Sequence, residues 1–408
     1  MITYWYLSEE EKVHWEKYDL KTRLGLSDSI HIVREHPLVG WHRNIVLVPV
    51  IQNHKELFAD KNNNFFTRLT TKQKYWLRTN PEAVIAFIDG LEVKPIVEEY
   101  SDNITKGILK IKEEFKIRNR FIFFNNDIHG TIVDKELKIE KAGGLLYPQF
   151  TYKKELTEKE IKEHFLEFTT VPTFTKKIVS MNGRFRPSRS ILVDKIRKHT
   201  PKEDLYLSYH GLADDWSFEQ AESILQGTYP QHNTPELMSL LSKTPYSTYD
   251  KEKITNLYKG SNKQIFIPEP EIYNDIFIDI MTETLCEREN DWRESCREGQ
   301  FITEKTTKPI IALKPFMILA SRGYLEYLRD LGFKTFDNWI NELYDRADYD
   351  DAINIIEDNI KYINSLSIDQ LYTMYKEMEP TLLHNRKRLF NLLYKEENRF
   401  SKIIENIT

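Results

Sequence analysis

A charged triplet in the second half of the chain has residue types suited to nucleotide binding. Thr303, Glu304 and Lys305 stand directly before the largely apolar run 308–321. If Thr303 caps a helix, the other two lie in its first turn, where a carboxylate can hold a ribose diol and an ammonium can reach phosphate oxygens. Burial of these charges is costly unless a ligand or partner pairs them. The alternative is a helix cap with one solvated ion pair.

A second group of candidates lies between an expected strand and an expected helix. Asn182 is followed by Arg184, Arg186 and Arg189. Backbone N–H groups converge at a helix N-terminus and favour anions there, and arginines can clamp a diphosphate bidentately. A solvated basic turn is the alternative interpretation.

The first half of the chain must then supply an α/β scaffold. Runs 43–51, 83–89 and 120–126 are apolar and rich in β-branched or aromatic residues, and we predict that they are buried strands. Between the last two, apolar residues at three- and four-residue spacing within 104–115 predict a helix. Strand, helix and strand in this order indicate a Rossmann-like sheet, although no Gly-rich dinucleotide fingerprint is present.

The second half repeats this alternation after a Gly-Gly and Pro break at 141–150. We predict strands at 176–182 and 263–269, and a helix that turns into a strand in 308–321. Further helices are expected at 153–168, 191–199, 223–227, 235–243, 351–366, 368–379 and 381–400. The expected organisation is two α/β domains, 1–170 and 171–349, followed by a helical tail, 350–408.

Composition narrows the possible classes. The chain has 408 residues, a formal charge of −5, 40% hydrophobic and 30% charged residues, which is typical of a globular protein. Its pI near 6.2 favours neither nucleic acid nor an anionic membrane as the main partner. Two cysteines argue against a disulfide framework, and His31, His36 and His42 lack the partners of a metal site. With no apparent signal peptide or membrane segment, we expect a cytoplasmic protein.

The two charged segments, taken together, resemble the α1,3-fucosyltransferase family. Residues 301–305, Phe-Ile-Thr-Glu-Lys, are similar to its (Tyr/Phe)-x-Thr-Glu-Lys signature, and strand 176–182 with Arg189 is similar to its strand ending in Ser-Asn with a downstream Arg. Segment 281–284 resembles its Phe-Glu-Asn-Ser element, with Glu283 at the Glu position and Thr in place of Asn. Over 176–385 the chain looks most like the fucosyltransferase-like proteins of large viruses, phages and some bacteria.

This resemblance implies a GT-B-like fold, in which two Rossmann-like domains face each other across a cleft. It implies an inverting glycosyltransferase that moves a sugar from a nucleotide-diphosphate donor, with GDP-fucose favoured, to a glycan or other hydroxyl acceptor. No metal and no cofactor besides this donor substrate are implied, and a viral enzyme would act in the host cytoplasm. The donor-binding residues would be Asn182, Arg186, Arg189, Glu283, Thr303, Glu304 and Lys305.

Such a reaction needs a carboxylate from the first domain to deprotonate the acceptor. Glu35 and Glu92 are the candidates that we favour, with Asp89 and Asp127 also near expected strand ends. Each of these carboxylates could instead be a cap or a surface residue.

Two other classes of function remain open. The chain could be a structural or glycan-binding protein, such as a virion component, that keeps the fold without activity. It could also be another nucleotide-dependent enzyme, but the absence of a Gly-x-x-x-x-Gly-Lys-(Ser/Thr) motif argues against a P-loop kinase. The sequence leaves the oligomeric state undefined.

Overall fold

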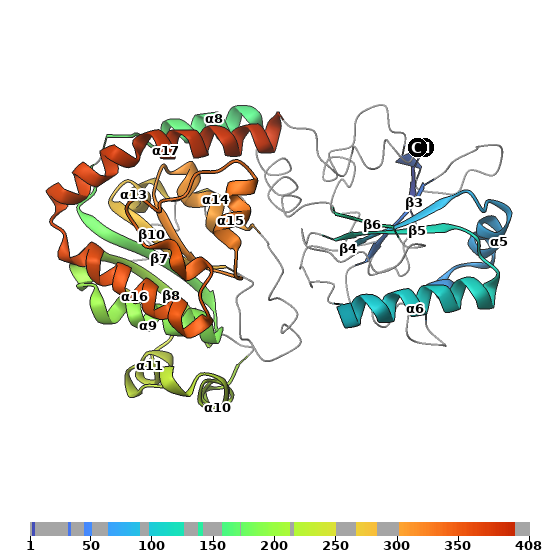
Figure 1. The fold of residues 1–408 in the computed structure, drawn as a ribbon, viewed down its shortest axis with the longest axis horizontal. Helices are drawn as coiled ribbons and strands as arrows, with labels where there is room; N and C mark the ends of the chain where they lie inside the picture. The colour runs from blue at the N-terminus through green and yellow to red at the C-terminus, as the bar shows by residue number, and fades with distance from the viewer. Residues whose placement is uncertain are drawn as a thin grey trace. The chain divides into compact units, whose positions relative to one another are not determined.

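The protein is α/β, and its described elements fall into two compact units (Figure 1). Unit 1 comprises residues 1–154, 298–301 and 396–408, and unit 2 comprises residues 155–297 and 302–395. The division thus falls 16 residues before the boundary expected at 170/171, and most of the expected helical tail belongs to unit 2. The structure, a computed structural model, describes residues 2–4, 32–33, 45–50, 64–89, 98–125, 138–141, 157–171, 173–212, 216–249, 267–283 and 302–395.

Unit 1 is built on a parallel sheet with the strand order β2-β1-β3-β4-β5-β6. Two helices of this unit, α5 and α6, each end shortly before a strand, β4 and β5 respectively. Phe65, Phe87 and Phe121 meet in its core, with ring centroids 5.0–6.3 Å apart. The elements are β1 (Ile2–Tyr4), β2 (Ile32–Val33), β3 (Ile45–Val50), α4 (Phe65–Arg68), α5 (Thr71–Thr79), β4 (Val84–Asp89), α6 (Glu98–Phe115), β5 (Arg120–Asn125) and β6 (Lys138–Lys141).

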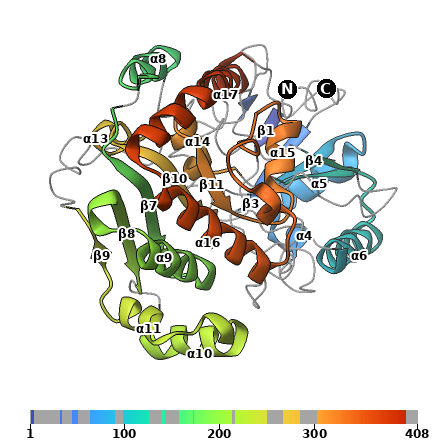
Figure 2. The same ribbon diagram turned by 60° about the vertical axis from the view of Figure 1, so that its left-hand side comes forward.

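Unit 2 has a five-stranded sheet with the order β11-β10-β7-β8-β9, in which only β9 runs antiparallel to its neighbour. Helices α9 and α16 cover one face of this sheet, and α14 and α17 lie over the other (Figures 1 and 2). The strands are β7 (Lys176–Arg184), β8 (Leu205–Gly211), β9 (Tyr246–Ser247), β10 (Ile276–Thr282) and β11 (Phe316–Leu319). The helices are α8 (Glu158–Leu166), α9 (Pro187–His199), α10 (Phe218–Thr228), α11 (Pro235–Leu241), α13 (Pro270–Tyr273), α14 (Glu304–Ile311), α15 (Tyr324–Asp330), α16 (Tyr349–Ser365) and α17 (Ile368–Tyr394).

The strand order reverses beside the first strand of both sheets, although the full orders differ. In unit 1, β1 lies between β2 and β3, and in unit 2, β7 lies between β8 and β10. The order therefore reverses between β1 and β3 in unit 1 and between β7 and β10 in unit 2. Ligands of open α/β sheets bind beyond the carboxyl ends of the strands at such a reversal.

The C-terminal helices are part of unit 2 rather than an appended tail. Tyr375 of α17 donates a hydrogen bond of 2.7 Å to the carbonyl of Leu313, and Tyr372 donates one of 2.8 Å to that of Phe174. On the other face, Glu357 of α16 forms a 2.6 Å ion pair with Lys195 of α9. Helix α17 also runs through Pro380, where the sequence predicted two separate helices.

The longer predicted elements are confirmed. Strands expected at 43–51, 83–89, 120–126 and 176–182 correspond to β3, β4, β5 and β7, and 308–321 contains the end of α14 and β11. Strand β10 lies in a run that the sequence analysis left unassigned. Most of the strand predicted at 263–269 lies outside the described residues.

Candidate functional site

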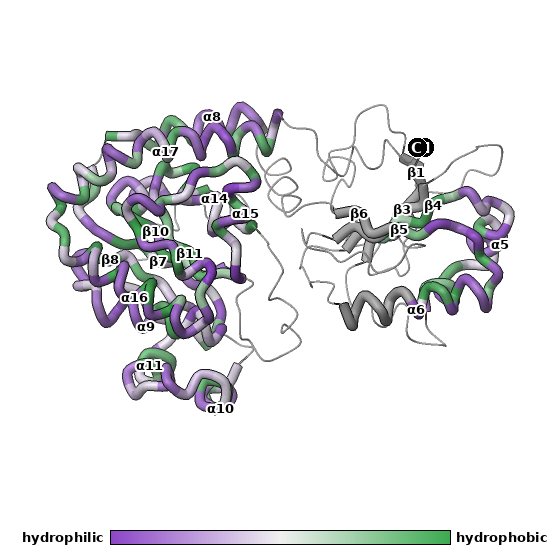
Figure 3. Tube along the Cα trace, in the orientation of Figure 1, coloured by the Kyte–Doolittle hydropathy of each residue, from purple (hydrophilic) through white to green (hydrophobic). Residues whose placement is uncertain are grey.

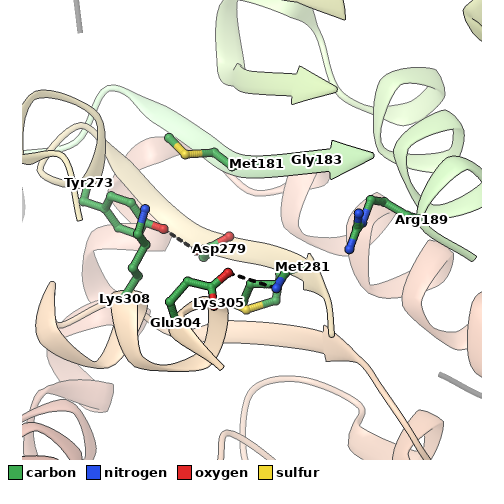
Figure 4. A pocket seen from close by; sticks show the side chains of 9 residues that line it. All are labelled: Met181, Gly183, Arg189, Tyr273, Asp279, Met281, Glu304, Lys305 and Lys308. Atoms are coloured by element: carbon green, nitrogen blue, oxygen red, sulfur yellow. Dashed lines mark hydrogen bonds and ion pairs between the residues drawn. The ribbon is translucent and has the colours of Figure 1, made fainter. Parts of the chain in front are cut away.

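A pocket of about 270 Å³ lies at the strand-order reversal of unit 2. Met181 and Gly183 reach it from β7, and Met281 from the neighbouring β10 (Figure 4). Glu304 and Lys305 come from the first turn of α14, while Arg189 comes from the first turn of α9. Segments more than a hundred residues apart in sequence thus supply one cavity. Its remaining lining residues are Tyr273, Asp279 and Lys308.

The first turn of α14 is fixed by a buried carboxyl group. Thr303 is the N-cap, and its Oγ1 accepts a hydrogen bond of 3.2 Å from the backbone N–H of Lys305. Glu283, only 1% exposed just beyond β10, accepts the backbone N–H of Thr303 at 3.1 Å and its hydroxyl at 2.8 Å. Thr306 and Tyr324 donate to the same carboxyl group at 3.0 and 3.2 Å. Glu283 therefore holds the turn that carries Glu304 and Lys305, and it does not line the pocket.

Glu304 and Lys305, in the first turn of α14, form a partly buried ion pair. The Lys305 Nζ lies 3.0 Å from Glu304 Oε1 and 3.3 Å from Thr303 Oγ1. Burial acts to raise the pKa of Glu304, but the Lys305 charge and hydrogen bond, with smaller contributions, hold it below its usual value. Glu304 is thus an ionised acceptor beside a cation, which suits a ligand that carries both hydroxyl and phosphate groups.

Arg189 supplies positive charge from the opposite side of the pocket. It is 6% exposed, and its Nη1 donates a 2.7 Å hydrogen bond to the carbonyl of Arg184. This contact folds the guanidinium back over the end of β7, towards Gly183 (Figure 4). Pro187 begins α9 after an N-cap residue, Arg186, whose side chain makes no capping bond. The helix N-terminus and the guanidinium together favour an anion at this edge.

The inner end of the pocket holds a second polar group. Asp279 lies in the middle of β10, is 4% exposed, and accepts a 2.7 Å hydrogen bond from the hydroxyl of Tyr273 (Figure 4). Burial raises the pKa of Asp279 to about 7, in spite of the hydrogen bond from Tyr273 and the charge of Lys308. Lys308 itself lies 3.6 Å from Glu269. A ligand that reaches this end meets a carboxyl group that exchanges its proton near neutral pH.

The residues predicted as a donor site are only partly brought together. Arg189, Glu304 and Lys305 line the pocket. Glu283 and Thr303 do not line it, but they are hydrogen-bonded to each other and hold the first turn of α14. Asn182 is buried and donates a 2.9 Å hydrogen bond to Ser180 instead of lining the pocket. Arg186 is the α9 N-cap and also lies outside the lining set. The predicted bases Glu35 and Glu92 lie outside the described residues, as does Asp127.

The sequence interpretation missed the inner part of the pocket. Asp279 is a single carboxylate within the apolar strand sequence Ile-Phe-Ile-Asp-Ile-Met, and this placement could have marked it as a candidate site residue. A lone charge in a strand buried on both faces needs a partner or a function. Tyr273 and Lys308 have no comparable signal, because only the fold brings them beside Asp279.

The sequence matches no known family model, and a search of curated proteins finds no significant match. Within the described residues, no group of three or more His, Cys, Asp or Glu side chains could hold a metal ion. No helix in the described part of the chain is both long and apolar enough to cross a bilayer.

Proposed function

We propose that the protein is an inverting glycosyltransferase that transfers a sugar from a nucleoside-diphosphate donor to a hydroxyl acceptor. The observation that carries this proposal is the convergence of Arg189, Glu304 and Lys305 on one pocket at the strand-order reversal. The resemblance of residues 301–305 to the fucosyltransferase signature supports the same assignment and favours GDP-fucose. In this proposal the two units are the domains of a GT-B enzyme, with the donor in unit 2 and the acceptor in unit 1.

Each residue of the pocket then has a defined task. Glu304 accepts hydrogen bonds from the ribose diol, and Lys305 binds the diphosphate. Arg189 joins Lys305 in neutralising the charge that develops on the diphosphate as the sugar leaves. The acceptor hydroxyl attacks the anomeric carbon from the opposite side and inverts it, while its proton passes to a carboxylate of unit 1, for which Glu35 and Glu92 remain the predicted candidates.

Removal of either cation is expected to weaken nucleotide binding. Lys305→Ala and Arg189→Ala should each lose about 1.5–3 kcal/mol, or roughly ten- to hundredfold in Kd, because each deletes a charge-assisted contact. Titration calorimetry with GDP, UDP and ADP measures this loss and identifies the preferred base. Lys198→Ala, which removes an exposed cation elsewhere on α9, is the matched control. Unchanged affinity in both pocket variants would remove the donor-site assignment.

Glu304→Gln separates a ligand contact from a structural ion pair. If Glu304 holds the ribose, nucleotide affinity should fall clearly while the unfolding midpoint of the free protein changes little. If it serves only as a partner for Lys305 and the helix dipole, the free protein should lose about 1 kcal/mol of stability with affinity unchanged. Melting curves and calorimetry on the same sample decide between these outcomes. Nucleotide binding without sugar transfer to any acceptor would favour the non-catalytic alternative.

A further inference from the structure

Unit 1 carries a group of exposed or half-exposed cations on α5 and around the start of β5, which we call the basic edge. It comprises Lys72, Lys74, Arg78, Lys116, Arg118 and Arg120. Lys72, Lys74 and Arg78 belong to α5, Lys116 and Arg118 follow the end of α6, and Arg120 is the first residue of β5. Figure 3 shows α5 and the end of α6 as largely hydrophilic.

Five contacts bring these segments together. Lys74 Nζ and Arg78 Cζ each lie 5.4 Å from the ring centroid of Phe66, and that ring stacks on Phe115 at 4.0 Å, next to Lys116. The buried Asn119, between Arg118 and Arg120, donates hydrogen bonds to the carbonyls of Asn80 and Ala83. The end of α5 and the start of β5 therefore form one surface.

The cations of the basic edge differ from many others in the protein. In unit 2, Lys162, Lys195, Arg329, Lys361 and Lys395 each lie within 4.0 Å of a carboxylate. No carboxylate among the described residues lies that close to any of the six basic-edge cations. Residues 71–82 and 112–120 contain seven exposed or half-exposed cations, the six of the basic edge and Lys112, and three exposed carboxylates, Glu82, Glu113 and Glu114. The edge is positive in a chain whose formal charge is −5.

An exposed aromatic side chain lies within this surface. Tyr75 is 69% exposed and stands on α5 between Lys74 and Arg78 on the outward side. A tyrosine among lysines and arginines on the outside of a helix is suited to the headgroup region of a bilayer, where the ring enters the interface and the cations meet lipid phosphates. Single-stranded nucleic acid is bound along grooves in which several aromatic side chains stack on the bases. Tyr75 instead lies on the exterior of a helix, which favours a lipid surface over nucleic acid.

We propose that the basic edge of unit 1 docks reversibly on an anionic lipid surface, with Tyr75 entering the headgroup layer. This docking is independent of the donor pocket in unit 2. Each cation near such a surface should strengthen binding about fivefold, and added salt should weaken it.

Sedimentation with vesicles tests this proposal on the full chain. The protein should bind vesicles of phosphatidylcholine with 30% phosphatidylserine at low salt, and bind pure phosphatidylcholine far more weakly. The variant Lys72→Gln/Arg118→Gln/Arg120→Gln removes three cations that do not contact Phe66 and should lose about a hundredfold in binding. Tyr75→Ser should lose several-fold at constant charge.

The control variant Lys198→Gln/Lys376→Gln/Lys387→Gln removes three exposed lysines of unit 2 and should bind vesicles as the unmodified protein does. Equal melting midpoints show that the variants are folded. If the triple variant Lys72→Gln/Arg118→Gln/Arg120→Gln does not fold, the single variant Lys72→Gln is used for the same test. Absence of binding to the anionic vesicles, or an equal loss in the control, would overturn the proposal. Tight binding of a single-stranded RNA oligonucleotide through the same residues, without vesicle binding, would assign the edge to nucleic acid instead.

Discussion

Lys314→Met is expected to raise the free energy of unfolding by about 1–4 kcal/mol at pH 7, because replacing a buried charge by an apolar side chain of similar length is often stabilising. Lys314 is 3% exposed just before β11, and its Nζ lies 5.6 and 5.2 Å from the ring centroids of Phe174 and Tyr375. Its backbone N–H donates a hydrogen bond to the carbonyl of Pro309, but its ammonium makes none with any described residue. Urea unfolding of both proteins measures the difference.

The same lysine gives the effect a defined pH dependence. Burial lowers the pKa of Lys314 to about 7, although the charge of Asp275 opposes this shift. Between that value and about 10.4, the unfolded chain keeps the proton and the folded chain does not, so the stability of the unmodified protein rises with pH. The advantage of the methionine variant should therefore shrink by about 1–3 kcal/mol between pH 7 and pH 9.

Lys198→Met, at an exposed position of α9, is the matched control and should change stability by less than about 0.5 kcal/mol at either pH. A Lys314→Met protein that is less stable than the unmodified one at pH 7 would contradict the prediction. It would show that the contacts of the ammonium with the two rings outweigh the cost of its burial.

The sequence predicted strands that are apolar along most of their length. Strands β3 and β4 are of this kind, and the described side chains of β4, residues 84–87, are buried, as expected for a parallel sheet that is covered on both faces. Strand β8 was missed because Leu-Tyr-Leu-Ser-Tyr-His-Gly mixes apolar and polar residues without a clear period. Strand β1 was missed because only three residues pair. The break predicted at Pro380 does not occur, because the packing of α17 against the rest of unit 2 outweighs the backbone hydrogen bond that the proline removes.

The candidate site was predictable where its residues are close in sequence. Thr303, Glu304 and Lys305 form one motif, and its capping role follows from the sequence alone. The basic edge and the Tyr273–Asp279 pair were not predictable, because the fold assembles them from separate segments. The overall charge of −5 likewise conceals a positive surface, since net charge carries no information on how charges are distributed.

Glu283 was interpreted from the sequence as a ligand-binding residue, and its surroundings give it a positioning role. Four hydrogen bonds reach its carboxyl group from Thr303, Thr306 and Tyr324, and its own backbone N–H donates a 2.9 Å hydrogen bond to the carbonyl of Leu319. It therefore connects the ends of β10 and β11 to the first turns of α14 and α15. A buried group with this many partners leaves several donors unsatisfied when it is removed.

Glu283→Ala is accordingly expected to lower the free energy of unfolding by about 3–5 kcal/mol, the range seen when one partner of a buried polar network is deleted. Glu283→Gln keeps the shape and one acceptor, so its loss should be smaller. Glu326→Ala removes an exposed carboxylate from α15 that pairs with Arg346, and it should cost no more than about 1 kcal/mol. Urea unfolding of the three variants gives this ranking.

The positioning role also predicts an effect on the pocket. Because Glu283 holds Thr303, its replacement by glutamine should loosen the turn that carries Glu304 and Lys305 and weaken nucleotide binding in protein that is still folded. Rescue distinguishes this effect from general destabilisation: nucleotide affinity should stay low when Glu283→Gln is combined with the stabilising Lys314→Met. Recovery of full affinity in the double variant would show that Glu283 acts on stability alone. A Glu283→Ala protein that unfolds like Glu326→Ala would show that the hydrogen bonds around Glu283 do not hold α14 in place.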